Sequence, residues 1–334
     1  MASNAHQVSL ICAKGSSAAA EKGGLVLPPN LKLIETIDTS WEGKEAAEEA
    51  YYRSYKGIIE KECGDGDGIV WDNTWNSFSY LSAVKFPKMK IIHTHHGVAE
   101  WQRIPPNQIQ FPRYIGLSRL HAKYLSSLWK IPVRYVHHGI PLPPKEETRS
   151  DKSDNYLLSL NRIIPEKGIE DSIDIARRTE TPIKIIGDDV HVRDRSYVQR
   201  IRERCQDTRG LAEYIGLVNN EIKKILIKNC KAVIACPKPS WIEAFGLYAL
   251  ESNAYGKPVL ALANGGLNDI IVNQTNGFIT NTPEELEGYV NRIPECSAES
   301  CRKRVEDFFT VEIMSKNYLE IFAGVTEDDP LFRW

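Results

Sequence analysis

The feature that most constrains the fold is a regular alternation of short apolar runs with helix-like segments, which occurs twice along the chain. The first series covers residues 7–136 and the second covers residues 156–322. This alternation is typical of parallel sheets covered by helices on both faces. Pro141-Leu142-Pro143-Pro144 separates the two series and cannot continue a sheet interior. The sequence therefore predicts an α/β protein with two Rossmann-like, doubly wound parallel-sheet domains that face each other across a cleft.

The expected strands set the domain boundaries. We expect a first domain over residues 1–145, a second over 146–322 and a C-terminal tail at 323–334, which suits a chain of 334 residues. Strands are expected in the first domain at residues 7–13, 31–37, 69–71, 90–93, 113–117 and 133–136. In the second domain they are expected at residues 156–160, 183–186, 214–215, 232–236, 258–262 and 277–279.

Charge and composition exclude several classes of protein. The formal net charge is −2, so no overall field attracts a nucleic acid. The arginines between residues 193 and 209 are offset by Asp194, Glu203 and Asp207, and we expect no nucleic-acid partner. No apolar run approaches the roughly 18 residues that span a bilayer, and no charged leader opens the chain, so we expect a cytoplasmic location. The seven cysteines are scattered, which favours reduced thiols over disulfides or zinc.

A candidate ligand site lies between Pro239 and Val259. Glu243 and Glu251 stand eight positions apart around Gly246, where a helix over residues 244–255 is expected to begin. An eight-residue step along a helix is ~12 Å, so both carboxylates can reach one extended ligand.

The first turn of this expected helix suits an anion, because its backbone N–H groups lack partners within the helix. The residues of that turn are Ala244, Phe245, Gly246 and Leu247. We expect a diphosphate there, with a sugar beside Glu243 and ribose hydroxyls at Glu251. The alternative is a buried helix face whose acids are solvated at the surface.

Two cations follow the expected strand at residues 156–160. Arg162 and Lys167 lie in the loop after this strand, at the carboxyl edge of the sheet. A planar guanidinium and an ammonium can together neutralise a leaving diphosphate without a metal. The alternative is a loop with solvated charges. Gly265-Gly266, after the strand at 258–262, either lets a phosphate or sugar approach the backbone or forms only a tight turn.

In order and spacing, these motifs resemble those of one enzyme family. Residues 156–280 resemble the donor half of the GT-B glycosyltransferases of the large retaining family 4. The matching segments are Asn161-Arg162, Glu166-Lys167-Gly168, Pro239-Ser240, Glu243-Ala244-Phe245-Gly246-Leu247, Leu250-Glu251, Gly256-Lys257-Pro258-Val259 and Gly265-Gly266.

The resemblance implies that a sugar is transferred from a nucleotide diphosphate sugar to a hydroxyl acceptor with retention of the anomeric configuration, without a metal or another cofactor. It implies that Arg162 and Lys167 hold the diphosphate, that Glu243 faces the sugar hydroxyls and that Glu251 binds ribose. The segment 244–247 would cradle phosphate and sugar.

The first half resembles the family at fewer positions. Thr94-His95-His96-Gly97 is similar to a strand-end motif in which one histidine lies close to the donor sugar. His96 aligns first and His95 second, so the predicted catalytic residues are Glu243, His96, Arg162 and Lys167. A neutral imidazole could hydrogen-bond a sugar hydroxyl or stabilise charge at the anomeric carbon.

The acceptor-side loop departs from the family pattern. Gly23-Gly24 is followed by Pro28-Pro29, so this glycine pair cannot open the long helix that family members carry. We therefore assign the acceptor side to Gly15, Ser16 and His95. His138 is a second departure, because family members usually carry asparagine there.

A metal site is an alternative use of the histidines. The candidates are His93, His95, His96, His137 and His138. No carboxylate or cysteine completes an obvious set, so we predict no metal.

The sequence is compatible with several classes of acceptor and with more than one function of the same fold. The acceptor would be a sugar, a lipid-linked molecule or another compound with a hydroxyl group. The basic helix expected at 119–129 could make a peripheral contact with an anionic membrane, although packing of its apolar side on the first sheet is favoured. Two other functions fit the same fold: a phosphorylase or sugar-nucleotide hydrolase, and a non-catalytic subunit that binds a nucleotide-sugar.

Overall fold

The chain forms two compact units in the computed structural model. The residues described are 8–12, 14, 16–18, 28–36, 45–63, 68–74, 79–86, 88–97, 113–148 and 154–326. Unit 1 is drawn from Met1–Leu117, Ala122–Val136 and Ser315–Trp334, and unit 2 from Ser118–His121 and His137–Met314. Residues 315–322, which we had assigned to the second domain, thus group with unit 1. Residues 323–326 of the expected tail continue the last helix.

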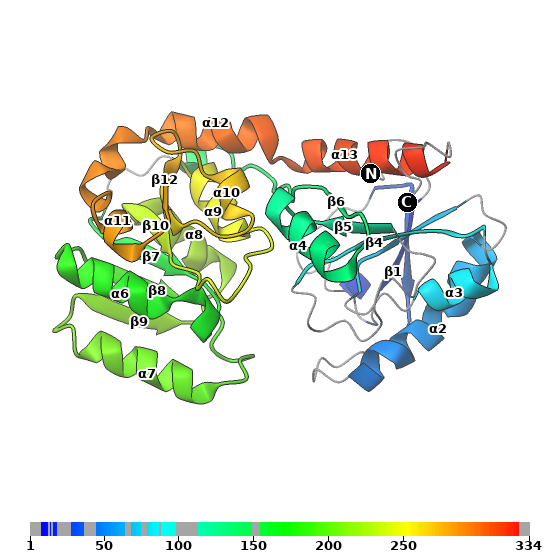
Figure 1. Ribbon diagram of the computed structural model, residues 1–334, viewed down its shortest axis with the longest axis horizontal. Coiled ribbons are helices and arrows are strands. Elements are labelled where there is room, and N and C mark those ends of the chain that lie inside the picture. The colour runs from blue at the N-terminus through cyan, green and yellow to red at the C-terminus, as the bar shows by residue number, and fades with distance from the viewer. Residues whose placement is uncertain are drawn as a thin grey trace. The chain divides into compact units, whose positions relative to one another are not determined.

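Unit 1 contains two parallel sheets (Figure 1). Its strands are β1 (Val8–Cys12), β2 (Leu31–Glu35), β3 (Ile69–Asp72), β4 (Lys90–Thr94), β5 (Arg113–Gly116) and β6 (Arg134–Tyr135). Its helices are α2 (Glu45–Cys63), α3 (Tyr80–Lys85) and α4 (Arg119–Trp129), whose first turn belongs to unit 2, and the greater part of α13 (Val311–Thr326). β1 pairs with β2, and β3 to β6 follow one another in the second sheet.

Helix α13 joins unit 1 through aromatic and hydroxyl contacts. The Tyr318 ring lies 4.4 Å from the ring of Trp71 on β3. Its hydroxyl forms a 2.9 Å hydrogen bond with Thr94 at the end of β4. These contacts explain why the C-terminal part of this helix groups with the first half of the chain.

Unit 2 is a single six-stranded parallel sheet with the order β12-β11-β10-β7-β8-β9. Its strands are β7 (Leu157–Leu160), β8 (Ile183–Ile186), β9 (Ala212–Gly216), β10 (Ala232–Ala235), β11 (Val259–Leu262) and β12 (Gly277–Thr280). The chain winds outward from β7 to β9, returns to β10 beside β7, and winds the other way to β12. This is the doubly wound order predicted from the strand and helix alternation.

Helices cover both faces of this sheet. They are α5 (Lys145–Thr148), the 3-10 turn η4 (Pro165–Lys167), α6 (Ile169–Arg178), α7 (Arg195–Gln206), α8 (Asn220–Asn229), α9 (Leu247–Ala254), α10 (Leu267–Ile270), α11 (Pro283–Glu287), the 3-10 segment η5 (Val290–Glu295) and α12 (Ala298–Phe308). Side chains of α6, α7 and α11 share one apolar core with one face of the strands. Side chains of α8 and α9 form the core on the other face.

Helix α6 shows why the sequence forms these elements. Ile169, Ile173 and Ala176 repeat at helical spacing and are fully or almost fully buried. Acids occupy its first turn and arginines its last turn, which complements the helix dipole.

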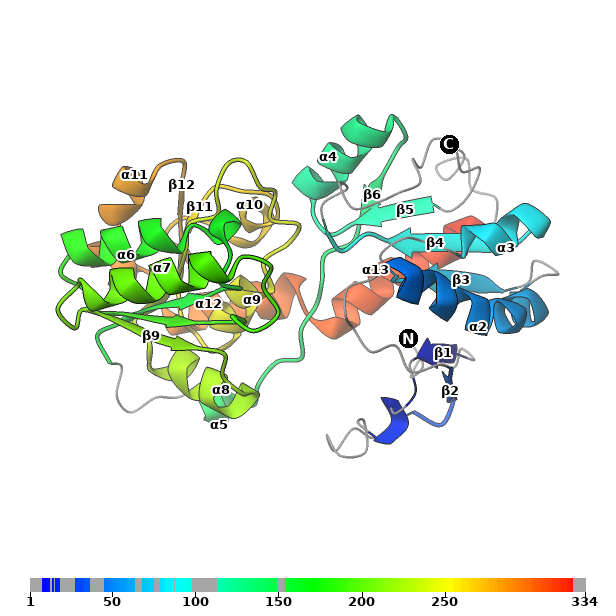
Figure 2. The same cartoon turned by 90° about the horizontal axis from the view of Figure 1, so that it is seen from below.

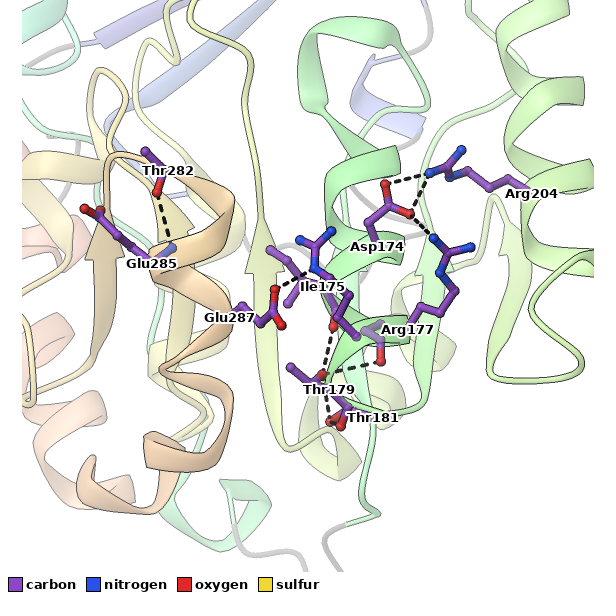
Figure 3. A network of polar contacts seen from close by, with 11 residues as sticks. Asp174, Ile175, Arg177, Thr179, Thr181, Arg204, Thr282, Glu285 and Glu287 are labelled. Atoms are coloured by element: carbon purple, nitrogen blue, oxygen red, sulfur yellow. Dashed lines mark hydrogen bonds and ion pairs between the residues drawn. The ribbon is translucent and has the colours of Figure 1, made fainter.

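Polar contacts tie α6 to its neighbours on the outer surface. α6 and α7 lie side by side (Figure 2), and Arg204 of α7 donates to both carboxylate oxygens of Asp174 on α6 at 2.6 Å (Figure 3). Glu287 of α11 accepts from Arg178 at 2.5 Å. These partners are partly exposed, so the pairs align the helices more than they stabilise the fold.

At Gly168, the backbone of the loop after β7 packs closely against the backbone at the end of β10. The φ of Gly168 is +58°, and a Cβ built there would lie 1.8 Å from the carbonyl oxygen of Cys236. Only glycine allows both the left-handed conformation and this approach of two backbones.

Replacing Gly168 with alanine should therefore lower the free energy of unfolding by about 3 kcal/mol, because left-handed strain and a backbone clash add. Gly210→Ala is the matched control: its φ is +90°, but nothing lies within 4 Å of the new Cβ, so we expect a loss of about 1 kcal/mol. Urea unfolding followed by circular dichroism measures both. Equal losses would contradict the close approach at Gly168.

Candidate active site

The candidate site forms where the sheet of unit 2 changes winding direction. β7 and β10 are neighbours at the centre of the sheet, and the chain leaves them in opposite directions. Loops after two such strands diverge at their carboxyl ends, where open parallel sheets bind ligands. The loop after β7 carries Arg162 and Lys167, and the loop after β10 carries Glu243. The topology thus brings residues from two predicted motifs to one edge of the sheet.

Lys167 and Glu243 form an ion pair between these two loops. Nζ of Lys167 lies 2.5 Å from Oε2 of Glu243, and the two side chains are only 13% and 11% exposed. The hydroxyl of Tyr248 donates to the same oxygen at 3.3 Å. A nearly buried ion pair requires good geometry, because both charges lose much of their hydration.

The backbone around Glu243 is fixed by the turn after β11. Asn264 Oδ1 accepts from the N–H of Glu243 at 2.7 Å, and its Nδ2 donates to the carbonyls of Trp241 and Lys238. The N–H of Gly266 donates to the carbonyl of Glu243 at 2.8 Å. Asn264 was not predicted from the sequence. An asparagine directly before paired glycines at a strand end is a signal that could have identified it, because its amide readily bonds nearby backbone groups.

Gly265 and Gly266 pack directly on the loop that carries Glu243. A Cβ on Gly265 would lie 1.8 Å from the carbonyl oxygen of Glu243, and one on Gly266 would lie 2.4 Å from Cα of Phe245. Each glycine therefore allows a backbone contact within the protein. This is the tight-turn alternative of the sequence analysis, and these contacts hold the Glu243 loop in place.

The prediction of a helix beginning at Ala244 is wrong. Helix α9 begins at Leu247, because Gly246 adopts φ +103° and ψ 57°, which does not fit an α-helix. Phe245 is not in a helical turn, and its side chain is 2% exposed. Its ring lies 5.7 Å from that of His137 and 5.6 Å from that of His138. Only Leu247 of the four expected first-turn residues lies in the helix.

The remaining predicted donor residues lie in different electrostatic settings. Glu251 on α9 pairs with Lys223 on α8 at 2.8 Å. Arg162 is exposed and forms no ion pair with any of the residues described. Lys238, on the loop before Glu243, was not predicted from the sequence. Its Nζ lies 2.6 Å from Oδ2 of Asp171. Most charges around the site are therefore neutralised by neighbours.

Asp269 on α10 holds the segment that packs against Phe245. Its carboxylate accepts from His137 Nε2 at 2.9 Å, and from Nε and the backbone N–H of Arg119 at 2.9 and 2.8 Å. Burial opposes ionisation, but these hydrogen bonds keep the pKa of Asp269 below its ordinary value. The charged carboxylate therefore stabilises the position of His137.

In unit 1, the neighbouring histidines His95 and His96 have different environments. His95 is 2% exposed and packs its ring 5.1 Å from that of Trp129. His96 is partly exposed, and its Nε2 lies 2.9 Å from Oδ1 of Asn73. Because Asn73 uses its Nδ2 to donate to the Trp71 carbonyl, its Oδ1 accepts, and His96 donates from Nε2. His96 is thus the histidine of this pair with the more accessible side chain.

The other predicted acceptor-side residues are less informative. Ser16 lies in a helical turn, and Gly15 lies outside the described residues. Within the part of the chain that the structure describes, no three His, Cys, Asp or Glu side chains gather as a metal site. Among those same residues, no helix has the length and apolarity needed to cross a membrane.

An unpredicted polar cluster lies next to His96. Asp72, at the end of β3, accepts hydrogen bonds from the hydroxyls of Ser79 and Thr74 and lies 3.7 Å from Nδ1 of His93. Burial alone would raise the pKa of Asp72, but His93 and these hydroxyls hold it well below its ordinary value. This cluster fixes the turn that carries Asn73, the partner of His96.

Comparison with known protein families identifies the second half of the chain. Residues 144–307 match the sequence model of the glycosyl transferases group 1. The chain carries a glycosyltransferase group 1 domain. This segment contains Arg162, Lys167, Glu243 and Glu251 together with the turn at Asn264. The match confirms a group 1 glycosyltransferase domain in the donor half, which is the coarser part of the resemblance stated from the motifs.

Relatives of known activity cover part of the chain. The O-antigen chain mannosyltransferase C of Escherichia coli is 25% identical over 230 residues, which are 65% of this chain and 60% of that protein. The match thus spans less than two thirds of the relative's own length.

Solved structures show the fold of the whole chain. A glycosyltransferase from Rickettsia africae superposes with a TM-score of 0.71 and 19% identity, covering 97% of this chain and 91% of its own. HepE from Anabaena, solved in complex with UDP, superposes with a TM-score of 0.70 and 12% identity, covering 95% and 92%. At these identities the likeness establishes the fold alone, and it confirms the predicted GT-B fold with two Rossmann-like domains.

The Asp269 contacts predict a specific pH dependence of stability. Because the folded-state pKa is lowered, the charged carboxylate stabilises the group 1 domain above the unfolded-state pKa of about 4, and this stabilisation is lost as pH falls through the folded-state value. Asp269→Asn should destabilise by about 1–2 kcal/mol at pH 7, and the difference from the parent protein should shrink toward pH 3. Urea unfolding at several pH values measures it, with the exposed Asp207→Asn as control. A difference that stays constant from pH 7 to pH 3 would rule out this role.

Proposed function

We propose that this protein is a glycosyltransferase that moves a sugar from a nucleotide diphosphate sugar to a hydroxyl acceptor. The observation that carries the proposal is the Lys167–Glu243 ion pair at the winding switch of a group 1 domain. The Lys167 ammonium is a group that binds phosphates, and the Glu243 carboxylate beside it can accept hydrogen bonds from sugar hydroxyls.

The diphosphate of the donor would be held by the loop after β7. Arg162 is exposed at this loop and supplies a planar guanidinium, and Lys167 supplies an ammonium. The N–H groups of Leu247 and Tyr248 at the start of α9 add donors without intrahelical partners, whereas that of Ala249 already donates to the carbonyl of Gly246. Negative charge grows on the diphosphate as the bond to the sugar breaks, so these groups stabilise the transition state more than the bound donor.

Glu243 would hold the donor sugar. Asn264 and Gly266 hydrogen-bond the backbone of Glu243, so its carboxylate projects from a loop with a fixed backbone. Glu251 would receive the ribose hydroxyls, after exchange of its contact with Lys223. HepE, a protein of the same fold, was solved with UDP, and the E. coli relative is named as a mannosyltransferase. Both are in keeping with a nucleoside diphosphate sugar as donor.

The acceptor side would be provided by unit 1. His96, with its proton on Nε2 toward Asn73, would hydrogen-bond a sugar hydroxyl or stabilise charge at the anomeric carbon. The resemblance to the retaining family implies attack on the face that the diphosphate leaves, with a phosphate oxygen as base. We propose that no metal takes part, since Arg162, Lys167 and the helix end supply the charge that the leaving group needs.

The donor can be identified by thermal stabilisation. A ligand that binds only the folded protein stabilises it by about 2.7 kcal/mol at a hundredfold excess over its Kd. We expect the melting temperature to rise with one class among UDP-, GDP- and ADP-sugars, and this rise to be lost in Lys167→Met and Arg162→Ala. Lys184→Met, which removes an ammonium paired with Glu213 on the same sheet, should keep it. A panel without any stabilising nucleotide-sugar would contradict the proposal.

Replacements at the site should reduce sugar transfer. With the identified donor and a panel of sugar, lipid-linked and small hydroxyl acceptors, we expect Lys167→Met and Glu243→Gln to lower kcat/KM by about 10²–10³-fold. Product analysis by mass spectrometry separates transfer from hydrolysis or phosphorolysis. Near-parental transfer by both variants would contradict the assigned site.

A further inference from the structure

Tyr248 occupies a position that the proposed roles do not use. It is the second residue of α9, and its ring packs against the apolar core between α8, α9 and the sheet. Its hydroxyl reaches the Glu243 carboxylate at 3.3 Å. The core thus fixes the ring, and the fixed ring delivers one hydrogen bond to the candidate site.

The two donors at Glu243 meet on one oxygen. Oε2 accepts from Tyr248 and from the Lys167 ammonium, whose Nζ is 2.5 Å away. No hydrogen bond joins Oε1 to any residue in the described part of the chain. The carboxylate is therefore held by one oxygen and offers the other.

Tyr248 is suited to remain a donor. Burial and the charge of Glu243 raise the pKa of Tyr248 well above its ordinary value, so the hydroxyl keeps its proton. The Lys167 ammonium also lies 5.9 Å from the centroid of the Tyr248 ring, within the range of a cation–π contact. Tyr248 thus contacts both members of the ion pair.

The two contacts respond differently to an incoming diphosphate. Lys167 has a long flexible side chain, and two phosphates would compete with Glu243 for its ammonium. The Tyr248 hydroxyl is attached to a ring that packs against the apolar core, so it does not follow the ligand. Once Lys167 turns to the phosphates, Tyr248 is the described residue that still holds Oε2.

We propose that Tyr248 is a positioning residue that keeps the Glu243 carboxylate oriented toward the donor sugar after Lys167 has moved to the diphosphate. This inference rests on the proposed function, because it assumes that Glu243 contacts the sugar. Tyr248 itself touches neither the sugar nor the diphosphate. Its effect should therefore appear only in the part of donor affinity that the sugar contributes.

The test compares binding of a nucleoside diphosphate with binding of its sugar ester. UDP with UDP-glucose and GDP with GDP-mannose are the probes, and calorimetry without acceptor measures each Kd. In Tyr248→Phe, we expect the ratio of the diphosphate Kd to the sugar-ester Kd to fall about 5–10-fold, which corresponds to one lost hydrogen bond. The Kd of the diphosphate alone should change less than twofold. An unchanged ratio would overturn the inference.

Tyr255→Phe is the matched control. Tyr255 lies at the end of the same helix and in the same apolar core, and no hydrogen bond from its hydroxyl to a described residue occurs. Its variant loses the same atom without touching Glu243, so the ratio should stay at the parental value. A similar fall in both variants would show a general packing effect and would also overturn the inference.

A double variant separates this inference from the proposed function. Glu243→Ala removes the acceptor, so adding Tyr248→Phe to it should leave the ratio unchanged. Independent, additive losses would contradict positioning through Glu243. If Glu243→Ala alone keeps the parental ratio, the assigned role of Glu243 fails. If it lowers the ratio and Tyr248→Phe does not, only the role of Tyr248 fails.

Discussion

The ion pair between Lys167 and Glu243 is the contact on which the site in the group 1 domain depends. Both side chains are largely buried, and removing either partner would leave an uncompensated charge. The pair keeps its geometry only if the two loops that carry Lys167 and Glu243 stay at a fixed distance from each other. Gly168 seats the Lys167 loop on the end of β10, and Gly265 and Gly266 seat the following turn on the Glu243 loop. Backbone contacts without side chains therefore provide the rigidity that the charged pair needs.

The strands of the group 1 domain could be predicted because their signal is local. Segments such as residues 232–236 are continuous apolar runs, and the structure buries every residue of β10. β10 is paired on both sides and covered on both faces, and its four residues are all apolar, as expected for such a strand. Placing Arg162, Lys167 and Glu243 at one edge then required only the rule that ligands gather at the carboxyl ends of parallel strands.

The details that the sequence did not reveal depend on contacts between distant residues. The start of α9 was predicted too early, because Gly246 adopts a positive φ and the Phe245 ring packs against those of His137 and His138. His137 and His138 lie more than a hundred positions before Phe245 in the sequence. The residue types at 244–247, taken alone, therefore still predict a first helical turn. Asn264 was missed for a similar reason, since its bonds reach back to the carbonyls of Lys238 and Trp241. Of the paired histidines, His95 turned out buried and His96 partly exposed.

The distribution of charge around the site suggests an order of events for an anionic ligand. The chain carries a net charge of only −2, so it has no strong overall field to guide a diphosphate. Lys167, Lys238 and Lys223 are each paired with a carboxylate. Arg162 is exposed and has no such partner among the residues described. An approaching diphosphate would thus meet the Arg162 guanidinium first, because that charge needs no exchange of partners. Only then would the ligand compete for Lys167, and the release of Glu243 would follow from binding and would not precede it.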